Sequence, residues 1–276
     1  MPSPGVSGFQ PGDPEAVEQL FDQIAPRYDQ LNDLLSLGLH RLWKRQAVAW
    51  LRPRPGQRLL DLCCGTGDLA LVLAARVRPG GVVLGLDAAA APLKVAARRA
   101  ACQPWLPVRW QQADAQATGL PAGGFDGAAM AYGLRNLADP AAGLVELRRL
   151  LRPGGRAAVL DFNRLAASRL DPAGVDGGGP GQAGHPMDHP AVDPVENPIP
   201  VGAGAVAAFQ RFYLRSLVVP VASAAGLREH YAYLEESLAR FPTGAQQEQL
   251  ALAAGFSHAH HRPLAAGLMG LLELVA

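Results

Sequence analysis

The sequence has little cysteine and almost no net charge. It contains 3 cysteines in 276 residues, two of them adjacent, and neither their number nor their spacing suggests a disulfide framework or a zinc site. Cysteine usage of this kind fits a reducing compartment, so we expect a cytoplasmic protein. The 25 basic and 24 acidic residues give a formal charge of +1 and form no Lys/Arg block, which argues against nucleic acid as a partner.

Long apolar runs are also absent. The first residues lack the basic start and apolar run of a signal peptide, and no stretch of about 18 uninterrupted apolar residues occurs. We therefore expect a protein that neither spans a membrane nor is exported. Residues 206–220 carry apolar side chains near helical spacing. Packing in the core is the stronger interpretation of this stretch, and peripheral contact with a membrane surface is the alternative.

Composition and periodicity indicate one domain with two unusual segments. Residues 1–15 are rich in proline and glycine, which predicts a flexible N-terminus, and residues 16–276 then form a single domain. Helical spacing of apolar residues over 16–51 predicts two or three short helices. Residues 165–205 hold 8 glycines and 7 prolines but no aromatic side chain, and this composition predicts a disordered insertion.

A repeat of strands and helices predicts the fold class. Between residues 58 and 162, short apolar runs such as RLLDL, VVLGLD and RAAVLDF alternate with helical stretches such as GLVELRRLL. This alternation is typical of an α/β protein with a mostly parallel sheet and helices on both faces. Two further β-like pieces, at 258–264 and 268–275, follow a helical region near 246–254.

The segment Leu59–Ala70, LLDLCCGTGDLA, predicts a loop that binds a nucleoside cofactor. An apolar strand reaches Asp61, and Gly65, Thr66 and Gly67 then turn the chain into a helix whose N-terminus offers free N–H groups. The same letters satisfy a dinucleotide-binding fingerprint, so the glycines alone also allow an NAD enzyme. The acid near the end of the strand favours S-adenosylmethionine, because a carboxylate there can bind the cationic amino group of that cofactor.

Acids follow the next two strands as well. Asp87 ends VVLGLD, where a carboxylate can accept both hydroxyls of a ribose, a feature shared with NAD enzymes. Asp114 follows VRWQQ and precedes the small residue Ala115, an order that suits contact with the adenine amino group. Each acid alone could be a helix cap or a turn former. Three acids at successive strand ends together favour S-adenosylmethionine.

Motifs outside this loop resemble those of a known family. The segments FDQIAPRYDQLNDLLSLGLHRLWKR (21–45) and AYGLRNLADP (131–140) accompany the loop, and LDFNR, HYAYLEESLARFPTG and AAGLMGLLEL extend the match toward the C-terminus. With these motifs the chain resembles the C-methyltransferases of ubiquinone and menaquinone biosynthesis. The later segments look like the cyanobacterial and plastid branch of that family.

The resemblance implies a fold, a cofactor and a reaction. The fold would be the class I, Rossmann-like fold of S-adenosylmethionine-dependent methyltransferases, with a seven-stranded sheet, an antiparallel last strand and an N-terminal helical lid over 16–51. The cofactor positions of the family fall on Thr66, Asp87, Asp114 and Ala115. The reaction would be methylation of a ring carbon of 2-phytyl-1,4-naphthoquinol, a prenylated naphthoquinol, in the last step of phylloquinone biosynthesis.

Methylation of a ring carbon requires one base and one group that stabilises an oxyanion, but no nucleophilic side chain. Arg135 and Asn136 follow the fourth strand, at the edge where ligands of open α/β sheets bind, and can donate hydrogen bonds to a quinol oxygen. Tyr28, Asp29 and His40 fall in the predicted lid. Asp29 or His40 is the candidate base, with Tyr28 against the ring. A structural role is the alternative for each of the five.

No metal is expected. His258, His260 and His261 lie close together in the sequence, but no Cys, Asp or Glu nearby completes a set of ligands. Two alternatives to the main functional hypothesis remain open. The first is the same chemistry on demethylmenaquinol or a ubiquinol precursor, and the second is a non-catalytic module that binds S-adenosylmethionine or NAD.

Overall fold

The computed structural model of the chain describes residues 38–164 and 237–276. Several predictions from the sequence fall outside these ranges, so the structure does not test them. They are the flexible segment 1–15, the lid from 16 to 37, the insertion 165–205, the apolar stretch 206–220, Tyr28 and Asp29.

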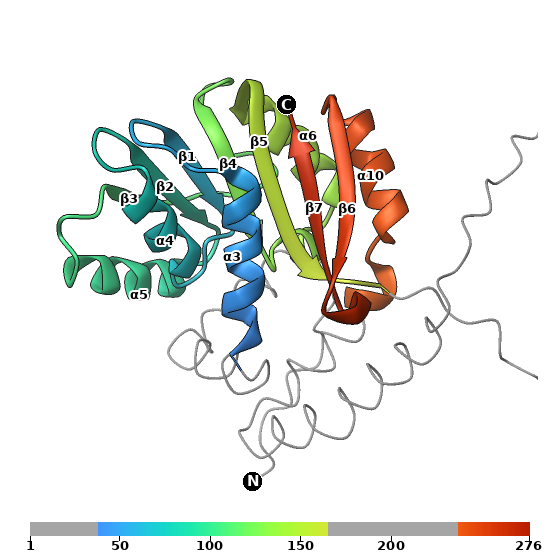
Figure 1. Cartoon of the computed structure of the whole chain (residues 1–276), viewed down its shortest axis with the longest axis horizontal. Helices are drawn as coiled ribbons and strands as arrows, with labels where there is room; N and C mark the ends of the chain where they lie inside the picture. Colours follow the sequence, from blue (N-terminus) through green and yellow to red (C-terminus); the bar gives the residue numbers. More distant parts are fainter. Residues whose placement is uncertain (1–37, 165–236) are drawn as a thin grey trace, which may run out of the picture.

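Seven strands form one sheet in the order β3-β2-β1-β4-β5-β7-β6 (Figure 1). Strands β1 to β5 pair in parallel, whereas β7 is antiparallel to both β5 and β6. This arrangement confirms the predicted fold class and the antiparallel last strand. The strands are β1 Arg58–Leu62, β2 Val82–Asp87, β3 Val108–Gln112, β4 Phe125–Ala131, β5 Leu151–Phe162, β6 His258–Leu264 and β7 Met269–Val275.

Helices cover both faces of the sheet (Figure 1). The described helices are α3 Leu39–Leu51, α4 Asp68–Arg76, α5 Ala90–Ala101, α6 Pro140–Leu150 and α10 Gly244–Ala253, with 3-10 turns η1 Leu134–Asn136 and η3 Ala265–Gly267. Two of them begin at side-chain caps, at Asp139 for α6 and at a Thr243–Gln246 capping box for α10. Within the described ranges, no helix is long and apolar enough to span a membrane.

The central strand β1 divides the core into two parts. Leu59 belongs to a buried cluster that includes side chains of α3 and α4, and Leu60 belongs to the cluster that includes side chains of α6 and α10. Neighbouring side chains of a strand point to opposite faces, so this division follows directly from the run RLLDL. The same alternation places the side chain of Asp61 on the face that α3 and α4 cover.

Strand order reverses at β1, which has β2 and β3 on one side and β4 and β5 on the other. Ligands of open α/β sheets bind outside the carboxyl ends of the strands at such a reversal. The run RAAVLDF predicted a start of β5 that is too late, because the strand begins at Leu151 and not at Arg156. The Pro153-Gly154 pair interrupts the apolar pattern there, and the register with β4 shifts between Phe125 and Gly127.

Candidate functional site

The predicted cofactor loop lies between the carboxyl ends of β1 and β2. The backbone N–H of Gly65 donates a hydrogen bond of 2.7 Å to Oδ2 of Asp87, and the N–H of Cys64 donates to the carbonyl oxygen of Leu86 at 2.9 Å. Gly67 precedes α4 with φ +82°, a left-handed conformation that favours glycine. Asp87, a predicted ribose ligand, therefore also orders the loop that is predicted to bind the cofactor.

A tryptophan packed against this loop was missed by the sequence analysis. The indole of Trp110, from β3, lies so close to Gly67 that a Cβ added to this glycine would be 2.4 Å from the ring. A Cβ added to Gly85 of β2 would also be 2.4 Å from it. The indole thus fills space that two glycines leave open. The sequence signal that could have identified it is a large aromatic residue in one strand, Trp110, next to a strand that contains a glycine, Gly85.

Replacing Gly67 by alanine should destabilise the loop. The left-handed backbone costs about 1–2 kcal/mol for a residue with a Cβ, and the contact with Trp110 adds about 1–3 kcal/mol. We expect a lower midpoint of thermal unfolding and a loss of cofactor affinity in calorimetry. Gly123→Ala is the matched control, because Gly123 has φ +65° and nothing within 4 Å of an added Cβ. Equal stability of the two variants would contradict the role of Trp110.

Asp61 is almost fully buried, with 1% of its surface exposed. Among the described residues, its Oδ2 has no hydrogen-bond partner, an unfavourable condition for a buried oxygen. Burial raises the pKa of this carboxyl from 3.8 to about 7, although the charge of Lys44 and a hydrogen bond from the backbone of Ala70 counteract the shift. A cationic group brought by a ligand would supply the missing partner.

Lys44 connects α3 to the cofactor loop. Its Nζ donates to Oδ2 of Asp68, the first residue of α4, at 3.2 Å and lies 5.9 Å from the centroid of the Tyr132 ring. Arg99 of α5 also pairs with Asp68, and it donates to Oγ1 of Thr66 at 3.2 Å. Burial pushes the pKa of Asp68 up, but the two cations outweigh this effect and lower that pKa. Two helices therefore hold the start of α4 in place.

The predicted adenine contacts lie on the loop after β3. Asp114 is exposed and accepts the backbone N–H of Gln116 at 2.9 Å, whereas Ala115 is buried in the core. The side-chain oxygen of Gln116 accepts the backbone N–H of Asp139 at 2.8 Å. This bond joins the predicted adenine loop to the segment that follows β4.

A buried carboxylate holds the far end of the same loop. Glu146 of α6 accepts hydrogen bonds from the backbone N–H and the hydroxyl of Thr118, and it pairs with Arg149 at 2.7 Å. The hydrogen bonds from Arg149 and Thr118 outweigh burial and lower the pKa of Glu146 to about 2. Glu146 therefore stays ionised at neutral pH and holds Thr118, at the end of the loop, against α6.

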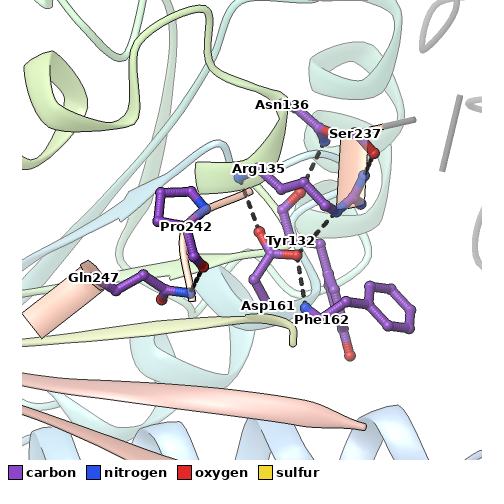
Figure 2. A network of polar contacts seen from close by, with 8 residues as sticks. All are labelled: Tyr132, Arg135, Asn136, Asp161, Phe162, Ser237, Pro242 and Gln247. Atoms are coloured by element: carbon purple, nitrogen blue, oxygen red, sulfur yellow. Dashed lines mark hydrogen bonds and ion pairs between the residues drawn. The ribbon is translucent and has the colours of Figure 1, made fainter. Parts of the chain in front are cut away.

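Arg135 is buried in an ion pair (Figure 2). Its Nε donates to Oδ1 of Asp161 at 3.2 Å, and its backbone N–H donates to Oδ2 at 3.1 Å. Its Nη1 donates to Oγ of Ser237 at 2.6 Å, and its guanidinium lies 5.7 Å from the centroid of the Phe162 ring. Burial raises the pKa of Asp161, and Arg135 counteracts the shift. Asp161 was not predicted from the sequence, although it lies near a strand end as the predicted acids do.

Asn136 stabilises the turn after β4. Its Nδ2 donates to the backbone carbonyl of Tyr132 at 2.9 Å (Figure 2). Tyr132 has φ +63°, a left-handed conformation that is unfavourable for a residue with a bulky side chain, and its ring lies 5.8 Å from that of Phe162. Backbone strain of this kind clusters at ligand sites. The structure thus gives Asn136 a local role and adds Tyr132 to the residues at this edge.

His40 is the described candidate for the base, and it is buried near the start of α3. It precedes Lys44 by four residues and therefore lies on the same side of the helix. The other described predictions share the carboxyl edge of the parallel strands. They are Asp61, Gly65, Thr66, Gly67, Asp87, Asp114, Ala115, Arg135 and Asn136.

The adjacent cysteines, Cys63 and Cys64, are not activated. Burial is the main cause that raises the pKa of both thiols well above its ordinary value, so both stay protonated and are poor nucleophiles. In the part of the chain that the structure describes, no three His, Cys, Asp or Glu side chains lie together as metal ligands.

The described residues fit S-adenosylmethionine. Asp61 has a buried carboxylate oxygen without a hydrogen-bond partner among the described residues, and Asp87 stands at the end of β2, where acids of nucleoside-binding α/β proteins commonly lie. The glycine turn at Gly65 and Gly67 lets a ligand approach the backbone closely. Together with a sheet that ends in an antiparallel strand, these features define a class I S-adenosylmethionine-dependent methyltransferase.

Comparison with known proteins narrows this class to a family. A family model described as the ubiE/COQ5 methyltransferase family matches residues 10–173. A Synechococcus elongatus protein named 2-phytyl-1,4-naphtoquinone methyltransferase is 45% identical over 95% of this chain and 98% of its own length. The chain belongs to the ubiE/COQ5 methyltransferase family.

A more distant relative supports the same family, and a solved structure supports the same fold. An Arabidopsis thaliana protein named chloroplastic 2-phytyl-1,4-beta-naphthoquinone methyltransferase is 38% identical over 92% of this chain and 84% of its own length. A solved structure of an S-adenosylmethionine-dependent methyltransferase from Aquifex aeolicus has a TM-score of 0.53 at 14% identity, over 97% of this chain and 99% of that one. The predictions of family, fold class, methyltransferase activity and methyl donor are confirmed.

Proposed function

We propose that the protein methylates a ring carbon of 2-phytyl-1,4-naphthoquinol, as the last step of phylloquinone synthesis. The observation that carries this proposal is the 45% identity, over 95% of the chain, to a relative named for this reaction. The site supports it, because the buried cation of Arg135 lies over the ring of Phe162, which packs against that of Tyr132, at the carboxyl edge of the sheet. A flat ring with an ionisable oxygen suits such surroundings.

The cofactor ligands in this proposal come from three strand ends. Asp61 binds the ammonium group of S-adenosylmethionine, and Asp87 accepts the ribose hydroxyls while Gly65, Thr66 and Gly67 contact the cofactor through the loop. In the same proposal Asp114 accepts a hydrogen bond from the adenine amino group, with the small side chain of Ala115 beneath the base. The burial of Asp61 and the bond from Gly65 to Asp87 support this assignment.

The protein's part in the chemistry is to orient the quinol and to stabilise charge. S-adenosylmethionine supplies a methyl group that positive sulfur already activates. Arg135 donates a hydrogen bond to a quinol oxygen and favours its ionised form, which directs negative charge to the neighbouring ring carbon. Asn136 is the second donor in this proposal. Holding the ring carbon in line can contribute about 7–11 kcal/mol to catalysis.

The remaining assignments concern the lid. Tyr28 packs against the quinol ring, and Asp29 or His40 removes the proton that the methylated ring carbon loses. The position of His40 supports its assignment as the base. It lies buried on the side of α3 from which Lys44 reaches the cofactor loop. The order of events needs no nucleophilic side chain and no covalent enzyme intermediate.

A panel of quinols tests this function. Purified protein receives S-adenosylmethionine with a labelled methyl group and either 2-phytyl-1,4-naphthoquinol, demethylmenaquinol or a ubiquinol precursor, each kept reduced. We expect the highest kcat/KM with the phytyl compound and some transfer to demethylmenaquinol, because both share the naphthoquinol ring. Transfer to the ubiquinol precursor alone would contradict the proposal.

The same proposal includes a cytoplasmic location. It also includes peripheral contact with a membrane, because the phytyl tail of the substrate partitions into lipid. On α3, Leu39 and Leu42 are 47% and 50% exposed, and the exposed Arg45 lies close to them. Apolar and basic side chains together suit an anionic bilayer surface. The quinol panel is therefore run with substrate in anionic vesicles, with which the protein should sediment; turnover without sedimentation would contradict this part.

A further inference from the structure

The amino acid half of S-adenosylmethionine carries two opposite charges, an ammonium group and a carboxylate. Asp61 suits the ammonium group, but an anionic side chain repels the carboxylate beside it. A cation close to Asp61 would form a charge-assisted hydrogen bond with this carboxylate and strengthen the binding of this half. None of the residues assigned to the cofactor so far supplies one.

Lys44 lies where such a cation is needed. Asp61 points to the face of the sheet that α3 and α4 cover, as does Leu59 two residues earlier. The Nζ atom of Lys44 lies 5.9 Å from the Tyr132 ring centroid, beside the end of β4, the strand that pairs with β1. Its charge also acts on the buried Asp61 carboxyl. Lys44 therefore lies near the carboxyl ends of β1 and β4.

The ion pair with Asp68 leaves Lys44 able to bind another anion. An ammonium group has three N–H donors, and Asp68 accepts one of them at 3.2 Å. Asp68 is also neutralised by Arg99 of α5, so this carboxylate is shared between two cations. The Lys44 side chain is 18% exposed, and a cation held this far from water interacts strongly with a ligand anion.

We propose that Lys44 binds the α-carboxylate of the methyl donor, at the same time as Asp61 binds its ammonium group. This inference rests on the proposed placement of the cofactor at the ends of β1 and β4. It gives α3 a binding role besides that of a cover over the sheet. The alternative is that Lys44 only ties α3 to α4 through Asp68.

Two ligands that differ in a single group separate these roles. S-adenosylhomocysteine has both the ammonium group and the carboxylate, and S-adenosyl-3-thiopropylamine has the ammonium group alone. Calorimetry on the full chain should give about tenfold tighter binding of S-adenosylhomocysteine by the wild type. Lys44→Met should remove most of this preference by weakening S-adenosylhomocysteine about tenfold and the amine less than about twofold. Lys44→Arg should retain the preference.

Arg45→Met is the matched control, because Arg45 is an exposed cation on the same helix and its loss changes the net charge equally. The contact proposed for Arg45 is with a bilayer, and the calorimetry contains no vesicles. Its ligand preference should equal that of the wild type. If Lys44→Met weakens the binding of both ligands equally, or weakens neither, the proposed role of Lys44 would be overturned. The proposed methyl-donor site would still stand. Failure of the wild type to bind S-adenosylhomocysteine would overturn the methyl-donor site as well.

Discussion

Replacing Asp61 by asparagine should stabilise the ligand-free protein and at the same time weaken S-adenosylmethionine binding. The wild-type carboxyl has a pKa of about 7 in the folded chain and 3.8 as its ordinary value. Between these values the folded chain binds a proton that the unfolded chain has lost, so the free energy of unfolding falls as pH rises from about 4 to about 7. Asparagine does not titrate and avoids this loss.

The effect of Asp61→Asn therefore depends on pH. Near pH 4 the two proteins should unfold with similar free energies, and at pH 8 the variant should be more stable by on the order of 2–4 kcal/mol in chemical denaturation. Cofactor affinity should change in the opposite direction, falling about 10–100-fold at pH 8 because the ammonium group loses its counter-ion. A variant that is less stable at pH 8, or that binds the cofactor as tightly as the wild type, would refute this role of Asp61.

The second large effect is expected at Arg135. Arg135→Met leaves the buried carboxylate of Asp161 without its cation, which should lower the free energy of unfolding by about 3–5 kcal/mol. Turnover should fall by about 100-fold or more, since a charge that stabilises the quinol oxygen is lost. Binding of S-adenosylhomocysteine should change little, because Asp61 and Asp87 remain in place.

A double variant separates the two roles of Arg135. Arg135→Met combined with Asp161→Asn removes both charges and keeps a side-chain oxygen that can accept a backbone N–H, so most of the lost stability should return in denaturant titration. Turnover should stay low if Arg135 acts on the substrate. Recovery of turnover in the double variant, or a loss of cofactor affinity as large as the loss of turnover, would mean that Arg135 only supports the fold.

The fold and the outline of the cofactor site could be predicted because their signals are local. The run RLLDL specifies both a strand and the alternation that sends Leu59 and Leu60 into separate clusters. The turn from Gly65 to Gly67 lies within one short segment, and its glycines have the positive φ values that such a turn requires. Asp87 was predicted by the same rule, an acid at the end of a strand.

The contacts that were missed join distant parts of the chain. Ser237 reaches Arg135 across 102 residues, and nothing in the local sequence marks this pairing. An acid at the end of a strand predicted Asp87, and the same rule applies to Asp161 at the end of β5. The motif LDFNR, which contains Asp161, served only to indicate the family resemblance. Lys44 was not predicted for another reason. Its role depends on how α3 packs across the sheet, and helical periodicity does not specify this packing.

The position of the transferred methyl group tests the proposed function most directly. Wild-type protein is supplied with S-adenosylmethionine carrying a 13C-labelled methyl group and with reduced 2-phytyl-1,4-naphthoquinone, and the product is examined by carbon–proton correlation NMR. We predict that the label is bonded to the ring carbon next to the one that carries the phytyl tail. A label on a quinol oxygen, or no transfer by protein that binds S-adenosylhomocysteine, would contradict ring-carbon methylation of this quinol.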